Sequence, residues 1–473
     1  MPFIGRDAEL AALEAEFDLV KESGAGRFAW LRGRRRVGKS RLVQELCDRA
    51  GAPYAFYQAP RRDMREAIAA FADAVAQSSL PAAPAFAGAS YDSWRTAIRA
   101  AVQGVAPAQP AILVVDELPY LAERDNGFTA DLQEAWDRVL EDVPVLLICV
   151  GSDVRMMESL LAERSPLHGR PTLERRVAPL NPAEVANLTE APDASSAFDR
   201  YLIVGGFPLL ASSWTRGVGR KAFLRKALAD DRTPLAATAL QILLSEFPRE
   251  LQVRDVVEAI GHGESAYSRI QARSGVKGNT LNEALEVLVE KKILVSRDLP
   301  YAVPLGKKAP RYAVADPYLR FWLRFVGPHL DEISRGRSDL VIDRIERDWA
   351  TYRGRAIEPL VRTALERLLD DPGTAERLGG ARHVGGWWRR DHSVEVDLVG
   401  GDRPAPTRIG FVGSIKWRDR GHFSTNDLHG LATARAEVPG AEGAKLVAVS
   451  RSGFAKGLDA DARFGPDELL AAW

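Results

Sequence analysis

The sequence predicts an α/β fold built on a buried parallel sheet, and three apolar runs with their flanking residues predict it. Two of the runs, Ala111–Val115 (AILVV) and Val143–Val150 (VPVLLICV), are short and continuous, which is typical of strands buried on both faces. The third run, Phe28–Leu31, precedes a glycine-rich turn and a segment, Lys39–Ala50, whose apolar residues recur at helical spacing. Strands that alternate with helices in this way form parallel sheets.

The turn after the first run, GRRRVGKS, consists of a glycine, four residues and then Gly-Lys-Ser. In this spacing the glycines let backbone N–H groups close around phosphates, and the start of the next helix adds a favourable dipole. Lys39 is expected to contact the β and γ phosphates, and Ser40 to coordinate Mg²⁺. The alternative is a chance glycine-rich turn. The expected nucleotide-binding residues here are Gly33, Val37, Gly38, Lys39, Ser40 and Arg41.

Acidic residues follow the run Ala111–Val115, at the end of the strand where ligands of open parallel sheets bind. Asp116 is placed to complete the Mg²⁺ shell, and Glu117 is placed to orient the water that attacks ATP. The alternative for Asp116 is to cap the next helix. Together with the glycine-rich turn, this pair predicts ATP hydrolysis and not only ATP binding.

Two further residues are candidates for contact with the transferred phosphate. Ser152 follows the run Val143–Val150 and is expected to face the γ phosphate; capping the next helix is an alternative, and one residue can do both. Arg170 lies in the loop SPLHGR, where its guanidinium could neutralise charge on the phosphate, within the chain or across a subunit boundary. A solvated loop arginine is equally consistent with the sequence.

Length and composition limit the class of protein. A chain of 473 residues is long enough for about three domains. Its 64 basic and 64 acidic residues give no global argument for or against nucleic acid, and two distant cysteines predict no disulfide framework. No signal sequence and no apolar run of about 18 residues is present, so we expect a cytoplasmic protein without a membrane span. The Pro/Ala-rich stretch Leu80–Ala89 is interpreted as a flexible connection.

The segment Glu250–Tyr312 predicts a winged helix: short helices, a turn at Ser274-Gly275, a helix over Thr280–Lys292, and strands at Leu294–Arg297 and Arg311–Val314. From Gly261 onward its nine basic residues outnumber five acidic ones, and this excess suits phosphate contacts. DNA binding and packing against other protein parts are equally supported. The nine are Arg269, Arg273, Lys277, Lys291, Lys292, Arg297, Lys307, Lys308 and Arg311.

Six segments occur in one order over the N-terminal half of the chain: FIGRDAEL (Phe3–Leu10), GRRRVGKS, VVDELPYL, GSDVRMMESLL, SPLHGR and YLIVGGFPLL (Tyr201–Leu210). Together they resemble the archaeal-type ATPase family, which belongs to the AAA+ and STAND branch of P-loop NTPases. The resemblance implies that Gly5 and Arg6 lie near the adenine end of the nucleotide and that a helical lid follows the sheet. It also implies a homo-oligomer that hydrolyses ATP at subunit interfaces.

The C-terminal part carries polar residues on two predicted strands, Val394–Val399 and Ile409–Trp417. Alternation along each strand places two of these side chains on one face. The carboxylates, with one from a preceding helix, could bind Mg²⁺ while a lysine positions a phosphodiester. The candidates are Glu358, Glu395, Asp397, Ser414 and Lys416.

The segments around these residues, GRAIE, GGWWRR, VEVDLV and GFVGSIKW, resemble the domain of unknown function that follows archaeal-type ATPase domains. That domain is similar to restriction-endonuclease-like PD-(D/E)XK nucleases. Such nucleases carry Glu or Asp where this chain has Ser414, and a neutral hydroxyl is a weaker ligand for a hard cation. The departure weakens the expectation of cleavage. The alternative is a fold retained for DNA or protein contact, in which Glu395 and Asp397 pair with arginines such as Arg389 or Arg390.

These expectations combine into a P-loop ATPase with ATP and Mg²⁺ as cofactors. Its expected segments are an α/β ATPase module (1–180), a helical lid (181–245), a winged helix (246–325) and an α/β restriction-endonuclease-like domain (326–473). The expected function is an AAA+/STAND-type switch coupled to double-stranded DNA. The alternatives are an ATP-gated, metal-dependent DNA nuclease and a STAND-type scaffold that binds protein partners.

Overall fold

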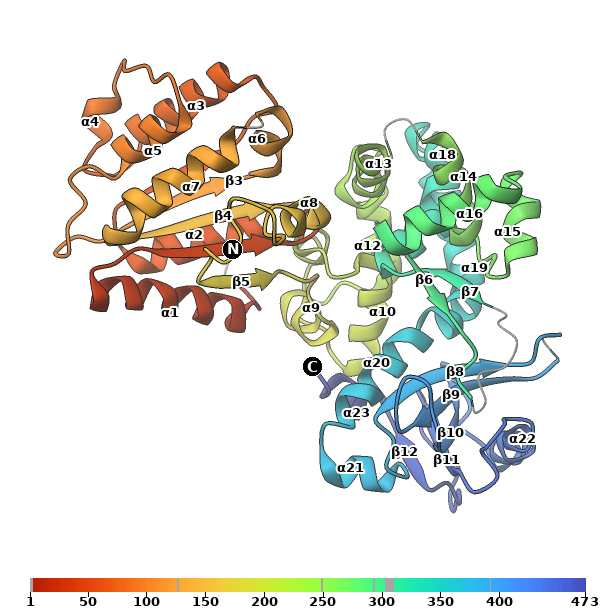
Figure 1. Cartoon of the computed structure of the whole chain (residues 1–473). Coiled ribbons are helices and arrows are strands. Elements are labelled where there is room, and N and C mark those ends of the chain that lie inside the picture. The colour runs from red at the N-terminus through yellow and green to blue at the C-terminus, as the bar shows by residue number, and fades with distance from the viewer. Residues whose placement is uncertain (1–2, 126, 248–249, 292–293, 303–309, 392) are drawn as a thin grey trace. The chain divides into compact units, whose positions relative to one another are not determined.

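The computed structural model describes residues 3–473 except for 126, 248–249, 292–293, 303–309 and 392. It comprises two compact units, Met1–Leu180 and Asn181–Trp473, which run from red to yellow and from yellow to blue in Figure 1. A five-stranded sheet lies in each unit, and the second unit also has a two-stranded sheet.

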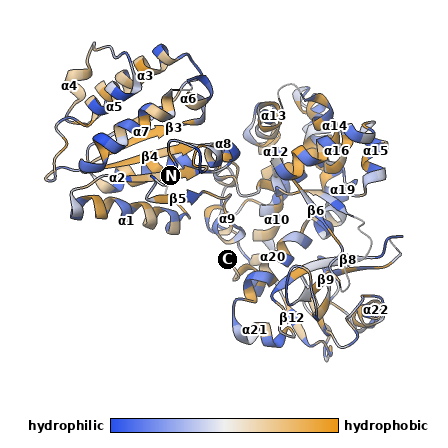
Figure 2. Ribbon diagram, viewed as in Figure 1, coloured by the Kyte–Doolittle hydropathy of each residue, from blue (hydrophilic) through white to orange (hydrophobic). Residues whose placement is uncertain are grey.

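The sheet of the first unit is parallel, with the strand order β2-β3-β4-β1-β5, which confirms the expected α/β fold. The three apolar runs form β1, β3 and β4. Every residue of β3 and β4 is buried, and Figure 2 shows hydrophobic residues along both strands. The strands are β1 (Arg27–Arg32), β2 (Tyr54–Gln58), β3 (Ala111–Asp116), β4 (Val145–Gly151) and β5 (Leu173–Arg176).

Helices cover both faces of this sheet (Figure 1). In β1, Phe28 and Trp30 pack into the core under α3 to α7, whereas Ala29 and Leu31 pack under α1 and α2. This alternation explains why the run is apolar throughout. The helices are α1 (Asp7–Ser23), α2 (Lys39–Ala50), α3 (Met64–Ala76), α4 (Ala83–Phe86), α5 (Trp94–Ala101), α6 (Pro119–Arg124), α7 (Phe128–Arg138), the 3₁₀ turn η1 (Leu140–Asp142) and α8 (Val154–Ser159).

The interpretation of Leu80–Ala89 as a flexible connection is wrong. The stretch contains the short helix α4, and Leu80 and Phe86 are buried in the core of the first unit. The ring of Phe86 lies 6.5 Å from the ring of Phe71 on α3. Ala82 and Ala83 are small enough to pack closely there, so part of a stretch whose composition suggested a linker belongs to the core.

Parallel register brings the carboxyl ends of three strands to one edge of the sheet. Leu31 of β1 pairs with Val150 of β4, and Val115 of β3 pairs with Cys149 of β4. The N–H of Gly33 then donates to the carbonyl of Gly151 across the end of the sheet, at 3.3 Å. The residues that follow these strands are therefore held side by side.

The second unit begins with a helical segment, and its first helix starts at a reciprocal cap. The side chain of Asn181 accepts a hydrogen bond from the N–H of Glu184, and the Glu184 carboxylate accepts one from the N–H of Asn181. The segment comprises α9 (Pro182–Thr189), α10 (Ala194–Val204), α11 (Pro208–Ala211), α12 (Arg220–Ala227) and α13 (Pro234–Glu246).

None of the helices in the described parts of the chain is long and apolar enough to cross a membrane.

Three helices and a two-stranded antiparallel sheet follow, in the order that the sequence predicts. Val295 pairs with Val314 in this sheet, and Gly275 ends the second helix with a φ of 72°. Lys292, Lys307 and Lys308 lie outside the described residues. The elements are α14 (Leu251–Gly261), α15 (Tyr267–Ser274), α16 (Gly278–Glu286), the π turn η2 (Val287–Lys291), β6 (Val295–Asp298), β7 (Arg311–Val314), α17 (Pro317–Phe321), the π turn η3 (Trp322–Val326) and the 3₁₀ turn η4 (Gly327–His329).

The C-terminal sheet is mixed, with the order β12-β11-β10-β9-β8: β8, β9 and β10 are antiparallel, and β10, β11 and β12 are parallel. The helices of this C-terminal part are α18 (Leu330–Ser334), α19 (Ser338–Ala356), α20 (Glu358–Leu368), α21 (Pro372–Arg377), α22 (Thr425–Arg435) and α23 (Pro466–Leu470). Its strands are β8 (His383–Trp388), β9 (Glu395–Gly401), β10 (Ile409–Lys416), β11 (Lys445–Ser450) and β12 (Ala462–Phe464).

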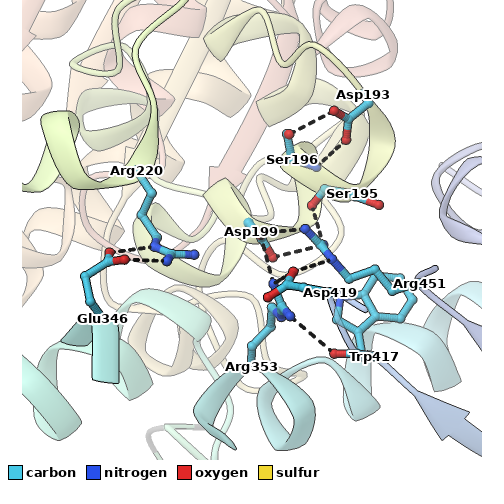
Figure 3. Close-up of polar contacts among 10 residues, drawn as sticks. All are labelled: Asp193, Ser195, Ser196, Asp199, Arg220, Glu346, Arg353, Trp417, Asp419 and Arg451. Atoms are coloured by element: carbon cyan, nitrogen blue, oxygen red, sulfur yellow. Dashed lines mark hydrogen bonds and ion pairs between the residues drawn. The ribbon is translucent and has the colours of Figure 1, made fainter. Parts of the chain in front are cut away.

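An ionic cluster joins the helical segment to the C-terminal sheet within the second unit (Figure 3). The carboxylate of Asp199, on α10, lies 3.0 Å from Arg451 and 3.4 Å from Arg353. Arg353 is only 1% exposed and lies 2.8 Å from Asp419. Since these residues come from α10, from α19 and from the segments that follow β10 and β11, the cluster holds distant parts of the unit together.

Candidate nucleotide site and C-terminal carboxylates

The glycine-rich loop runs from β1 to α2 in a backbone conformation that its glycines permit. A Cβ at Gly33 would lie 2.3 Å from the carbonyl oxygen of Val177, so no larger residue fits there. Gly38 has a φ of 94°, in the left-handed region that favours glycine. Arg36 adopts a φ of 66° in the same loop, which is an unfavourable conformation for a residue with a side chain. The loop is thus a defined, strained structure.

Lys39 lies at the start of α2, 6% exposed, and folds over the loop. Its Nζ donates hydrogen bonds to the carbonyl oxygens of Gly33 (2.8 Å) and Arg34 (3.0 Å). Burial lowers the pKa of Lys39 to about 8, and the carboxylates of Glu117 and Asp116 partly oppose this effect. Phosphate oxygens bound in the loop would replace the two carbonyls as partners of this ammonium.

Ser40 and Asp116, the two expected Mg²⁺ ligands, are in direct contact. The hydroxyl of Ser40 donates a hydrogen bond of 2.6 Å to Oδ2 of Asp116. Asp116 is 1% exposed, and burial raises its pKa above the ordinary value. A hydroxyl and a carboxylate oxygen are ligands that suit Mg²⁺, which is commonly held by one carboxylate and substrate phosphates. The residues present therefore fit this ion.

Glu117 is positioned by its backbone and by Ser152. It has a φ of 57°, and its N–H donates to Oδ1 of Asp116 at 2.9 Å. The hydroxyl of Ser152 donates to Oε2 of Glu117 at 2.7 Å. The next helix, α8, is capped by Asp153, whose carboxylate accepts from the N–H of Met156 at 3.0 Å. Ser152 is therefore not the cap, and its hydroxyl is directed to the candidate catalytic carboxylate.

The N-terminal pair Gly5-Arg6 reaches the loop. Gly5 and Arg6 both have positive φ, and the buried guanidinium of Arg6 donates to the carbonyl oxygen of Val37 at 2.9 Å. Arg41 points elsewhere: its side chain is 51% exposed and pairs with Glu45 one turn along α2, at 2.8 Å. Arg6 thus contacts the phosphate loop, whereas Arg41 is engaged on the surface of its own helix.

Arg170 lies away from the phosphate loop of its own chain. Its guanidinium forms two hydrogen bonds of 2.8 Å with Asp137 at the end of α7. Thr172, two residues on, donates from its N–H to the carbonyl of Phe28 near the start of β1. From Phe28 to Gly33, β1 spans about 16 Å. The structure therefore places Arg170 near the amino edge of the sheet, opposite the edge that carries the site.

Sequence reasoning missed a cluster beside the loop. The guanidinium of Arg35 donates to the hydroxyl of Tyr120, and the guanidinium of Arg61 lies 4.3 Å from the centre of the same ring. Arg61 comes from the segment after β2, which carries no recognisable motif. Its proximity to α6 depends on β2 and β3 being neighbours in the sheet, which local sequence does not reveal.

In the C-terminal sheet, Asp397 and Ser414 meet as their predicted strands imply. The hydroxyl of Ser414 donates to Oδ2 of Asp397 at 3.1 Å, and the N–H of Ile415 donates to the same atom at 2.7 Å. Burial raises the pKa of Asp397. Lys416 lies 3.9 Å from Asp427 on α22. Oδ2 of Asp397 is thus used by two hydrogen bonds within the sheet.

The other two acids, Glu395 and Glu358, have arginine partners, and the partner of Glu395 is not one of the arginines expected. Glu395 pairs with Arg311 of β7, while Arg389 lies 3.1 Å from Glu437 instead. Glu358 lies 3.2 Å from Arg362, and burial raises the pKa of Glu358 to about 7. Within the residues that the structure describes, no three His, Cys, Asp or Glu side chains are grouped so as to hold a metal ion.

Comparison with known families agrees with the geometry of the first unit. Residues 2–148, which include the glycine-rich loop, Asp116 and Glu117, match the family described as the AAA ATPase domain. The chain carries an AAA ATPase domain. Residues 322–430 match DUF234, described as archaea bacterial proteins of unknown function. The AAA ATPase domain is therefore combined with a DUF234 region in one chain.

Three known proteins are similar to this chain over more than half of its length. An uncharacterized protein of Methanocaldococcus jannaschii is 24% identical over 424 residues, or 88% of each chain. The solved Walker-type ATPase of Pyrococcus abyssi is similar over 68% of this chain and 96% of that chain, with 18% identity and a TM-score of 0.49. The ORC2 protein of Aeropyrum pernix, in ADPNP-ADP complexes, is similar over 73% and 96%, with 14% identity and a TM-score of 0.45.

The pKa of Lys39 predicts proton uptake when the AAA ATPase domain binds nucleotide. Phosphate charge favours the ammonium, so binding raises a pKa that burial holds at about 8 in the free protein. At pH 8.5 binding should take up a fraction of a proton, and below about pH 7 this uptake should vanish because Lys39 is protonated in both states. Calorimetric titration of ADP in two buffers of different ionisation enthalpy measures the uptake. A Lys39→Arg variant should show none from this residue, and equal uptake by both proteins would contradict the assignment.

Proposed function

We propose that the AAA ATPase domain hydrolyses ATP with Mg²⁺ and that the chain uses this turnover as a switch on double-stranded DNA. The observation that carries the hydrolysis is the continuous series of hydrogen bonds from Ser40 through Asp116 and Glu117 to Ser152. A site that only bound nucleotide would need no second carboxylate held beside the Mg²⁺ ligands. The series supports a role in catalysis for Glu117.

Lys39, Ser40 and Asp116 would bind the substrate. Lys39 would leave its two loop carbonyls and donate to the β and γ phosphates. Ser40 and Asp116 would hold Mg²⁺ through oxygen atoms, and the bound ion supplies charge neutralisation to the phosphates. The buried setting of Asp116 strengthens these electrostatic contacts because little water competes for them.

Glu117 would act on the nucleophile. Ser152 holds one of its carboxylate oxygens, and the other can accept a hydrogen bond from the attacking water and orient it toward the γ phosphate. Arg170 cannot reach this point in its own chain without a large rearrangement, since β1 separates it from the loop. The proposal therefore assigns Arg170 to the site of a neighbouring copy in a homo-oligomer, where it would exchange Asp137 for phosphate.

The coupling to DNA is proposed for α15 and the turn after it, within the helices and strand pair that support a winged helix. Arg269, Arg273 and Lys277 are exposed there and make no ion pair, among the contacts of the described residues. The strand pair is less available, because Arg311 of β7 contacts both Glu395 and the ring of Trp388. Exposed cations without carboxylate partners are suited to phosphate contacts.

The DNA contact predicts a defined loss in one variant. Replacing Arg269 and Arg273 with glutamine should weaken binding to duplex DNA about tenfold or more. The slope of log affinity against log salt concentration should also become shallower, by the amount that corresponds to about two phosphate contacts. The same replacement should also remove any stimulation of ATP turnover by DNA. Fluorescence anisotropy with a labelled duplex across a range of salt concentrations, followed by an ATPase assay, measures both.

The matched control is the double replacement of Arg225 and Lys226, two exposed residues of α12, with glutamine. This variant loses the same charge and should bind DNA as the wild type does. Equal binding by all three proteins would remove DNA contact by α15 from the proposal. ATP turnover that ignores DNA in the wild type would instead favour a switch that acts on a protein partner.

A further inference from the structure

The helical segment of the second unit contains a cavity of about 590 Å³. It lies between the loop that precedes α10 and the loop that precedes α12, and both loops line it. This volume falls within the range of about 300 to 1,000 Å³ that is usual for small-molecule sites. The residues that bear on its chemistry are Ser196, Asp199, Arg200, Trp214, Arg216 and Arg220.

Arg200 places a buried positive charge against this cavity. The residue is 5% exposed, its Nη1 donates to the carbonyl of Thr189, and its guanidinium lies 5.1 Å from the centre of the Trp214 ring. No carboxylate lies within ion-pair distance of Arg200 among the residues that the structure describes. A buried charge without a direct ion pair is unfavourable, and an anion in the cavity would add to the weaker compensation from the more distant Asp193.

The nearby carboxylates are already used by other partners (Figure 3). Asp193, which precedes α10, accepts hydrogen bonds from the N–H (2.7 Å) and the hydroxyl (3.0 Å) of Ser196. The carboxylate of Asp199 is held by Arg451 and Arg353. Neither carboxylate therefore forms an ion pair with Arg200, although the charge of Asp193 acts on it from a distance.

Two more arginines line the cavity, and their pairs differ in strength. Arg216 is 81% exposed and lies 3.1 Å from Glu190, which is 55% exposed. Such a surface pair contributes little and is easily exchanged for another anion. Arg220 is held by both oxygens of Glu346 and stays in place (Figure 3). Helix α12 begins at the edge of the cavity, after Gly219, without a side-chain cap. The first N–H groups of this helix therefore lack a capping oxygen.

We propose that this cavity binds a small molecule that carries a phosphoryl or carboxylate oxyanion. Arg200 is its buried cation, and Arg216 exchanges Glu190 for the ligand at the entrance. The planar guanidinium suits either oxyanion, because its N–H groups match two oxygens at once. Asp199 is the neighbour of Arg200 on α10, and it anchors that helix to Arg353 and Arg451. A ligand bound to Arg200 would therefore lie beside the ion pairs that connect α10 to the C-terminal sheet.

The test uses the full chain with Lys39→Ala, so that the phosphate loop does not compete for anions. Calorimetric titrations at low salt with pyrophosphate and with citrate should detect binding of at least one. Arg200→Gln should weaken this binding at least tenfold, and Arg216→Gln should weaken it about threefold to tenfold. Arg225→Gln on α12, an exposed residue outside the cavity lining, should leave it unchanged.

The two probes separate the sources of the ligand: binding of pyrophosphate alone indicates a phosphoryl compound, and binding of citrate alone indicates a carboxylate. If Arg200→Gln does not fold, as judged by circular dichroism, the exposed Arg216 decides the outcome. The proposal is overturned if neither probe binds, or if binding persists unchanged in the folded arginine variants. Because Lys39 is absent throughout, failure here leaves the proposed ATPase function unaffected, and the reverse also holds.

Discussion

Replacing Glu117 with glutamine should reduce the rate of ATP hydrolysis by about 100-fold or more and leave ATP binding nearly unchanged. Glutamine keeps the size of the side chain and can still accept from Ser152, but its amide cannot orient water as the carboxylate does. The bound phosphates are held by Lys39, Ser40 and the loop, which the substitution does not touch. Release of phosphate and binding of a fluorescent ATP analogue measure the two properties separately.

The matched control is Glu123→Gln, which removes the same charge from an exposed position on α6. It should hydrolyse ATP as fast as the wild type. A Glu117→Gln variant that retained normal turnover would show that another group orients the water. A variant that lost binding together with turnover would show instead that the carboxylate supports the fold of the loop, through its strained backbone.

Replacing Asp199 with alanine should destabilise the second unit by about 3 kcal/mol. Arg451 and Arg353 would lose a shared carboxylate, and Arg353 is 1% exposed, so water cannot replace the lost partner. The expected loss lies at the lower end for buried ion pairs because Asp419 still contacts Arg353 at 2.8 Å. Urea unfolding of the full chain, followed by tryptophan fluorescence, should show the transition of this unit at a lower midpoint.

Asp343→Ala is the control for this effect. Asp343 pairs with Lys221 at 3.6 Å between α12 and α19, but it is 71% exposed, and such pairs contribute little. Its removal should change the unfolding free energy by less than about 0.5 kcal/mol. Equal effects of the two substitutions would mean that the cluster around Asp199 is no more important than a surface ion pair.

The elements of the nucleotide site could be predicted because each depends on local sequence. The helix after the loop spans Lys39–Ala50, as its apolar spacing predicts, and the two apolar runs form fully buried strands. The contact between Ser40 and Asp116 follows from parallel register, which brings the ends of β1 and β3 to the same edge of the sheet on either side of β4. The residues of such a motif therefore specify its local structure.

Other features depend on contacts between segments far apart in the sequence, and local patterns do not specify these. Arg311 and Glu395 are 84 positions apart, so nearby arginines such as Arg389 were more obvious partners. Arg170 occurs in a suitable loop, but its position at the amino edge becomes evident only when β5 pairs with β1. The cavity at Arg200 likewise forms from two loops, neither of which carries a motif.

The most direct test of the central claim is steady-state release of phosphate from ATP by the wild type and by Lys39→Ala, with Mg²⁺ and with excess EDTA. The account predicts turnover by the wild type with Mg²⁺ and its loss in both the EDTA sample and the variant. No turnover by the wild type, or equal turnover by the wild type and Lys39→Ala, would contradict the assignment of this loop, Asp116 and Glu117 to ATP hydrolysis.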